Sequence, residues 1–129
     1  MDTSPEYISM CRRAKELQEM WEPSTGDYCA SSAGGCNRIL VVIADLPNKF
    51  LVVAYPYATY DNTDHILKQN IIWLPRIDQL IDMMGNDLRP DEGFTMTIQN
   101  RMTTEQELLN EHYKNTCHKS WNGEDWIKL

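Results

Sequence analysis

Hydrophobic residues recur along this chain at two spacings, which predict helices where the period is near 3.6 residues and strands where apolar residues are continuous or alternate. The clearest junction begins at Ile71–Leu74, an apolar run with two β-branched residues and a tryptophan, which is typical of a strand. Pro75 ends the strand pairing and suits the first turn of a helix. Apolar residues then return at helical spacing up to Gly85, at Ile77, Leu80, Ile81 and Met84. We predict a strand, a sharp turn and a helix whose Ile/Leu/Met face packs on the sheet.

A longer amphipathic segment occupies the N-terminal region. Thr3 or Ser4 caps its start, and Pro5 suits its first turn. The apolar positions of this segment are Tyr7, Met10, Cys11, Ala14, Leu17 and Trp21. The polar residues predicted to face away from the core are Arg12, Arg13, Lys15, Glu16, Gln18 and Glu19. The pattern predicts one helix that ends near Trp21.

A third helix is predicted near the C-terminus, where Thr103 or Thr104 stands three residues before Gln106 or Glu107 as a capping pair. Its less polar face comprises Leu108, Leu109, His112, Tyr113, Thr116 and Cys117. The chain then closes with a turn between two aromatic anchors, Trp121 and Trp126.

The remaining strand signals lie between the first and second helices. Residues 26–29 begin a first strand, and the apolar runs 38–44 and 50–55 predict a hairpin across the connection 45–49. Residues 57–70 are polar and irregular, and we interpret them as a long loop. Residues 94–98 alternate strictly, which predicts either a half-buried strand or an extended connector.

These elements predict a single α+β domain over residues 1–129, in which a small antiparallel sheet of about four or five strands is packed by three helices. An SH3-like barrel over residues 26–84 is the specific alternative.

The net charge of the chain limits the classes of binding partner that we expect. The 129 residues contain 12 Lys and Arg against 19 Asp and Glu, a formal net charge of −7. This balance argues against nucleic-acid or anionic-membrane binding, where basic surface supplies the affinity. The N-terminus lacks the order of a secretory signal, so we expect a cytoplasmic protein with reduced cysteines.

Four blocks of the sequence together resemble a known group of proteins. They are MCRRAKELQ at 10–18, WEP at 21–23 with Gly-Asp at 26–27, IWLPR at 72–76 with DQL at 78–80, and WNGEDWI at 121–127. In these blocks the chain is similar to small proteins from bacteriophages and prophages of Gram-positive bacteria. The resemblance implies a phage origin and does not imply any particular activity. Residues 29–36 and 94–102 lie outside it.

Two sets of residues are candidates for chemistry. Asp61, Asp64 and His65 lie in the polar loop, where a histidine beside carboxylates could act as an acid or base, although no nucleophile motif accompanies them. Tyr57 and Tyr60 stand in the same polar context and extend this set into a candidate binding surface. The alternative is that these residues form an ordinary solvent-exposed loop.

The cysteines form the second set. Cys29 and Cys36 are separated by six residues, a spacing wider than that of usual zinc-ligand pairs. Cys117 and His118 are adjacent on a helix, so they point in different directions. Loop thiols and a helix-face thiol are favoured over a metal site, and a Cys29–Cys36 disulfide is not expected in a cytosol.

The favoured hypothesis is a phage accessory protein that binds an unknown protein partner without catalysis, metal or cofactor. The rival is a small hydrolase or metal-dependent enzyme that uses the Asp61–His65 loop or the cysteines. A virion component that forms a homo-oligomer is the third interpretation.

Overall fold

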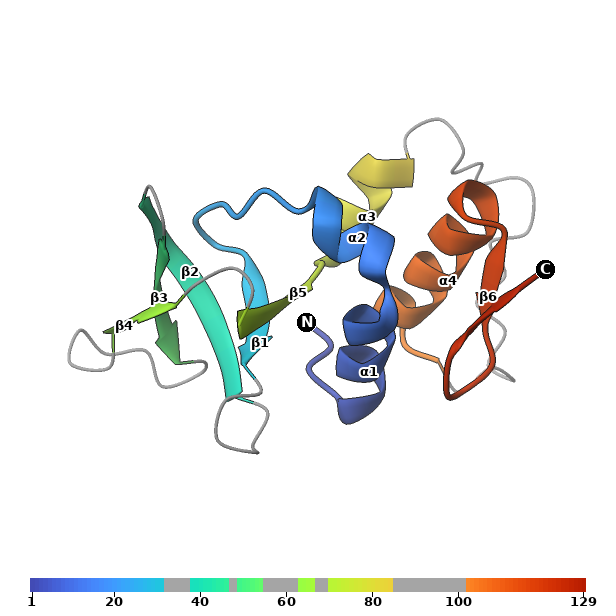
Figure 1. Cartoon of the computed structure of the whole chain (residues 1–129), viewed down its shortest axis with the longest axis horizontal. Coiled ribbons are helices and arrows are strands. Elements are labelled where there is room, and N and C mark those ends of the chain that lie inside the picture. Colours follow the sequence, from blue (N-terminus) through green and yellow to red (C-terminus); the bar gives the residue numbers. More distant parts are fainter. Residues whose placement is uncertain (32–37, 47–48, 55–62, 67–69, 85–101) are drawn as a thin grey trace. The chain divides into compact units, whose positions relative to one another are not determined.

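The computed structural model describes residues 1–31, 38–46, 49–54, 63–66, 70–84 and 102–129 (Figure 1). The chain divides into two compact units, which we name the helical unit (Met1–Met10 with Pro75–Leu129) and the sheet unit (Cys11–Leu74). Helices and antiparallel strands are both present, so the predicted α+β class is confirmed. The single-domain organisation stays a prediction.

The sheet unit is built on five antiparallel strands in the order β4-β3-β2-β1-β5. They are β1 (Tyr28–Ser31), β2 (Arg38–Leu46), β3 (Lys49–Ala54), β4 (Thr63–Ile66) and β5 (Ile71–Leu74). Strand β1 pairs with both β2 and β5, and its Cys29 stands opposite Leu40 on one side and Trp73 on the other. Strand β5 therefore forms one edge of the sheet, as the paired ladder ends there.

Two predictions about this sheet are wrong in detail. The segment 57–70 was predicted to be loop throughout, yet residues 63–66 form β4 and pair with β3 through the backbone. Backbone pairing needs no apolar pattern, so the polar residues of β4 concealed it. The hairpin connection is also shorter than the predicted 45–49, because Leu46 already pairs with Lys49. The predicted strand at 94–98 lies outside the described residues.

The N-terminal helix is not continuous as predicted. It consists of α1 (Pro5–Arg13) and α2 (Lys15–Met20), so the described residues hold four helices in place of the predicted three. Between them Ala14 takes φ −86° and ψ 73°, outside the helical region, and its N–H bonds Cys11 O at 3.1 Å. Alanine is the best helix former, so no local preference explains this break.

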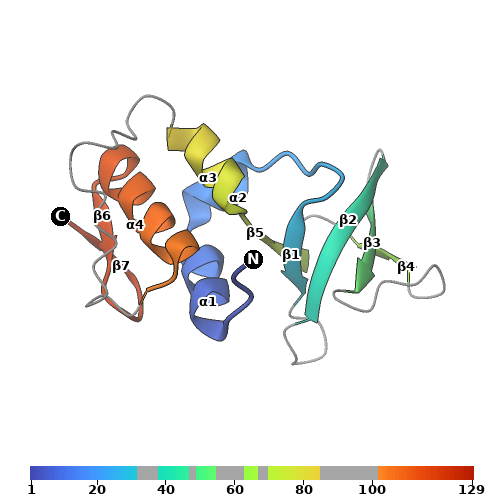
Figure 2. The same ribbon diagram turned by 180° about the vertical axis from the view of Figure 1, so that it is seen from behind.

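The helical unit contains α4 (Thr104–Thr116) and the hairpin of β6 (Lys119–Trp121) and β7 (Trp126–Lys128), which lie side by side in both ribbon views (Figures 1 and 2). The Thr103 hydroxyl accepts a hydrogen bond from Gln106 N, so Thr103 is the cap of this helix. Trp121 and Trp126 face each other across the hairpin, and both are buried. The predicted turn between two aromatic anchors is confirmed.

The anchors are held by hydrogen bonds as well as by burial. The indole N–H of Trp126 donates to Met10 O at 3.0 Å, and that of Trp121 donates to the Glu6 carboxylate at 2.9 Å. Trp126 also stacks on Tyr113 with ring centroids 4.3 Å apart. The hairpin is thereby fixed to α1 and α4 inside the helical unit.

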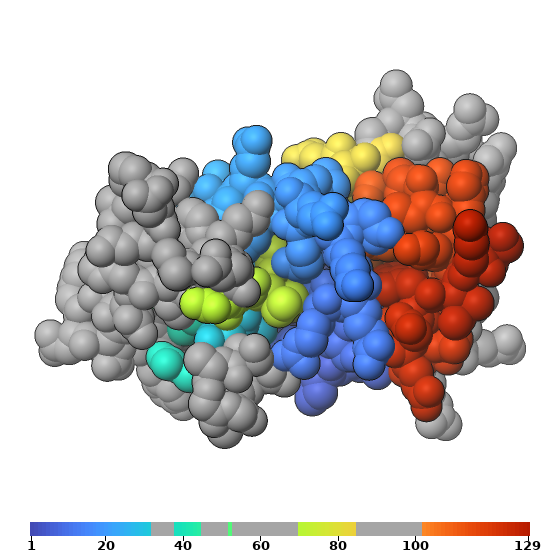
Figure 3. Space-filling view, viewed as in Figure 1, coloured from blue at the N-terminus to red at the C-terminus, as the bar shows by residue number. Residues whose placement is uncertain are grey.

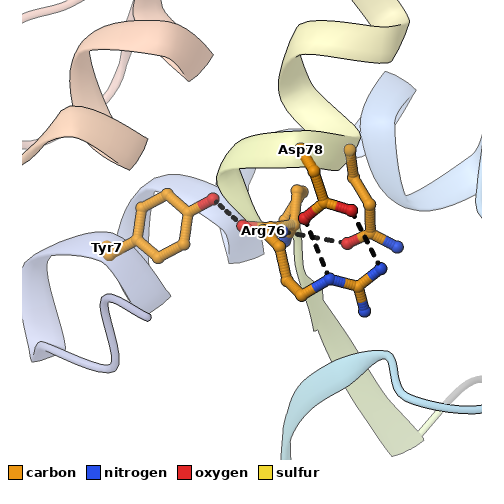
Figure 4. A network of polar contacts seen from close by, with 5 residues as sticks. Tyr7, Arg76 and Asp78 are labelled. Carbon is orange, nitrogen blue, oxygen red and sulfur yellow. Dashed lines mark hydrogen bonds and ion pairs between the residues drawn. The ribbon is translucent and has the colours of Figure 1, made fainter.

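Helix α3 (Ile77–Met84) begins in a polar turn that Figure 4 shows from close by. The Tyr7 hydroxyl donates to Pro75 O at 2.7 Å, and Arg76 N donates to the Gln79 side chain at 2.9 Å. The Arg76 guanidinium holds Asp78 through two contacts, at 3.1 and 3.3 Å. The hydrogen bond from Arg76 and its charge keep the pKa of Asp78 below its usual value.

The predicted packing of α3 on the sheet stays a prediction, while α3 contacts α4 within the helical unit. The predicted burial of its apolar face is only half correct. Leu80 and Met84 are buried, whereas Ile77 and Ile81 remain 38% and 40% exposed. Their spacing places both isoleucines on one helix face. The sequence pattern predicted that all four apolar residues of this helix are buried. Ile77 and Ile81 instead lie at the border of the buried face and are partly exposed.

Candidate binding groove beside strand β5

A groove of about 450 Å³ lies within the sheet unit, along the edge strand β5. Its lining residues come from the α1–α2 segment and from β5: Arg12, Lys15, Gln18, Glu19, Trp21, Ile71 and Ile72. In the space-filling view, atoms of β5 (yellow-green) reach the surface next to the blue atoms of the α1–α2 segment (Figure 3). We call this feature the β5 groove.

Gln18 joins one wall of the groove to the other. Its side-chain N–H donates to Trp73 O at 3.0 Å, and its side-chain oxygen accepts from Trp73 N at 2.8 Å. The same amide nitrogen donates to Cys11 O at 3.1 Å, beside the break between α1 and α2. The carboxamide therefore pairs with the outer edge of β5 as a peptide group of another strand would.

This pairing defines which backbone groups of β5 face the groove. In an antiparallel ladder, residues alternate between pointing their N–H and C=O toward one neighbour and toward the other. Because Trp73 presents both groups to Gln18, Ile72 and Leu74 point theirs toward β1. Ile71 shares the outer edge with Trp73 and lines the groove.

Stacked tryptophans support this wall. The rings of Trp21 and Trp73 are parallel within 2° and their centroids are 5.9 Å apart. The Trp21 N–H donates to the buried Asp27 carboxylate at 3.0 Å, which also accepts from Ser24 N at 3.0 Å. The indole N–H of Trp73 is buried and has no hydrogen-bond partner. The stack fixes β5 and the end of α2 against each other.

Charged residues stand at the rim of the groove. Among the lining residues that the structure describes, Arg12, Lys15 and Glu19 are charged, and all three side chains are exposed.

The binding surface predicted from the sequence is only partly described. Tyr57, Tyr60 and Asp61 lie outside the described residues, whereas Asp64 and His65 belong to β4. Asp64 stands opposite Val52 and His65 opposite Leu51 in the ladder with β3. Strand β4 ends the sheet on the side opposite β5. These two residues are therefore separated from the β5 groove by three intervening strands.

The described cysteine candidates belong to different units of the chain. Cys29 is buried in β1, and Cys117 is half-buried at the end of α4; both are free thiols, while Cys36 lies outside the described residues. Burial, with a smaller contribution from the Asp27 charge, raises the pKa of Cys29 to about 12. A thiol with that pKa is a poor nucleophile at neutral pH.

The described part of the chain contains no group of three or more His, Cys, Asp and Glu side chains placed to hold a metal ion. Nor does any helix within it have the length and apolar character needed to cross a bilayer. Comparison of the chain with protein-family models, curated proteins and solved structures finds no match.

Sequence reasoning missed Gln18 as a site residue. It was predicted to face away from the core with the charged residues of the helix, whereas it is half-buried and makes three hydrogen bonds. The signal that could have identified it is its position on the turn after Ala14 and one residue from Leu17, next to the buried face. Helical periodicity alone does not distinguish such a flanking residue from a solvated one.

Proposed function

We propose that this chain is an accessory protein of phage or prophage origin that works in the host cytoplasm by binding another protein, without catalysing a reaction. The observation that carries the proposal is the β5 groove, which runs along the edge of a sheet. Sheet edges with flanking pockets are a recurrent way to hold an extended segment of a partner. The sequence resemblance to small phage proteins supports the origin.

The strand order also supports the more specific fold within this proposal, an SH3-like barrel over residues 26–84. A meander in which the fifth strand returns to the first is the arrangement expected of such a barrel, and β5 does pair with β1. Small barrels of this kind commonly serve as binding modules for peptides.

One observation weighs against the enzymatic rival. Cys29 lies in β1, and its pKa of about 12 keeps it protonated at neutral pH. Nucleophilic catalysis requires a thiolate or a neighbouring base that produces one.

The test is affinity capture with the full-length chain as bait. Lysates of several Gram-positive hosts should yield one protein that is retained in stoichiometric amount, while the same bait denatured before coupling should not retain it. Failure to retain any such protein from every lysate would count against the proposal.

A further inference from the structure

The exposed turn between β6 and β7 contains an asparagine followed by a glycine, Asn122 and Gly123. We propose that this turn is a self-modification site, at which the backbone nitrogen of Gly123 attacks the side-chain carbonyl carbon of Asn122 and releases ammonia. Water then opens the resulting succinimide to aspartate or isoaspartate. Of the asparagines in the sequence, only Asn122 precedes a glycine. The inference does not depend on the β5 groove or on a protein partner.

The reaction balances with water as the only other reactant. A bond forms between Gly123 N and Asn122 Cγ, and the proton of Gly123 N passes to water or hydroxide. The bond from Cγ to Nδ2 breaks, and Nδ2 takes a proton from solvent and leaves as ammonia. Water that adds at Cγ gives aspartate and restores the backbone, whereas water that adds at the backbone carbonyl carbon gives isoaspartate. No electron donor or acceptor is needed.

The attacking nitrogen is accessible. Gly123 is exposed, and a Cβ added to it would meet no atom within 4 Å. Its φ of +103° belongs to the region that glycine adopts without strain, so the turn keeps a residue with no side chain next to the reacting carbon. Among the described residues, none accepts a hydrogen bond from Gly123 N. The nitrogen therefore has no partner to lose before it attacks.

The turn also holds the group that is attacked. Asn122 Oδ1 accepts hydrogen bonds from Glu124 N and from Asp125 N, both at 2.8 Å. Attack on Cγ places a negative charge on this same oxygen, so the two N–H groups act as an oxyanion hole for the tetrahedral intermediate. The Asn122 side chain is exposed, so the departing ammonia enters solvent directly.

Asn110 provides a comparison within the same chain. Its Oδ1 also accepts a hydrogen bond from a backbone N–H, that of Trp121 at 2.9 Å. The residue that follows it, Glu111, lies inside α4, where its N–H is used by the helix. Asn110 thus has a polarised carbonyl but no available nucleophile, whereas Asn122 has both.

The modification changes the hairpin that carries it. Isoaspartate adds a methylene group to the backbone between Trp121 and Trp126, which stand opposite each other and are both buried. Both indoles are also held by hydrogen bonds, to Glu6 and to Met10 O. A longer turn cannot keep this register without strain, so the isoaspartate form should be less stable than the original chain.

The test follows the folded full-length protein during incubation at neutral and mildly alkaline pH. Trypsin releases Asn122 in the peptide 120–128 and Asn110 in the peptide 102–114. Mass spectrometry with electron-transfer fragmentation then separates asparagine, aspartate and isoaspartate, after subtraction of a sample digested at time zero. We expect both products at Asn122, at a rate that rises with pH because the nitrogen must lose its proton. Asn110 should react at least about tenfold more slowly, since Glu111 N must first leave its helical bond.

The urea-unfolded chain is the reference for reactivity. If Asn122 stays intact in the folded protein while it converts in the unfolded chain, the turn protects the residue and the proposal is overturned. It is also overturned if aspartate forms without isoaspartate, because direct hydrolysis of the side chain by water then explains the product. Equal rates at Asn110 and Asn122 would likewise refute the role of Gly123 N.

The matched variant is Asn122→Asp, whose carboxylate can accept the same two hydrogen bonds and which is identical to the aspartate product. It should release no ammonia from this peptide. The isoaspartate form, purified by ion-exchange chromatography, should unfold at a lower urea concentration than Asn122→Asp. Equal midpoints would overturn the inference that the modification alters the hairpin.

Discussion

Replacing Gln18 with alanine should destabilise the protein far more than its position on a polar helix face suggests. The substitution removes three hydrogen bonds, two that the carboxamide donates and one that it accepts from Trp73 N. It leaves Trp73 N, Trp73 O and Cys11 O without these partners. Because β5 is at the edge of the five described strands, none of these strands replaces them.

The magnitude follows from the number of bonds. A hydrogen bond contributes about 1 kcal/mol net, so three bonds amount to a loss of about 3 kcal/mol in the free energy of unfolding. Water can reach this half-buried site and replace part of the loss, so we expect about 2–3 kcal/mol. With a urea m-value of about 2 kcal/mol/M, the unfolding midpoint should fall by about 1–1.5 M.

The assay is urea unfolding followed by far-ultraviolet circular dichroism, with Glu19→Ala as the control. Glu19 is exposed on the same helix, and its replacement should change stability by less than about 0.5 kcal/mol. If Gln18→Ala matches this control within error, the Gln18 carboxamide does not hold the β5 edge, and the reasoning above is refuted.

Three further predictions follow from buried side chains. Trp21→Phe should cost about 1–2 kcal/mol more than Trp73→Phe in urea unfolding, since only the Trp21 N–H has a hydrogen-bond partner; equal losses would contradict this. Burial lowers the pKa of His112 below 6.5, so stability should fall as pH drops through 6.5 toward that lowered value, and His112→Gln should flatten this dependence. Iodoacetamide labelling of the native protein, mapped by mass spectrometry, should modify Cys117 well before Cys29; comparable rates would refute the burial of Cys29.

The elements that the sequence predicted best are those whose signals are local. Strand β5, Pro75 and helix α3 follow one another as expected, because a proline and a change of hydrophobic period mark the junction. Thr103 and Thr104 were the two predicted caps of α4. The hydrogen bond from Gln106 N to the Thr103 hydroxyl shows that Thr103 is the cap. In each case the information lies within a few residues of the boundary.

The features that the sequence did not predict depend on hydrogen bonds that leave no pattern of hydrophobic residues. Ala14 leaves the helical conformation although its intrinsic preference is helical, and the carbonyl of Cys11 beside the break is satisfied by Gln18. Strand β4 is polar and is held by backbone pairing to β3. Neither feature leaves a periodic trace, so pattern analysis cannot detect it.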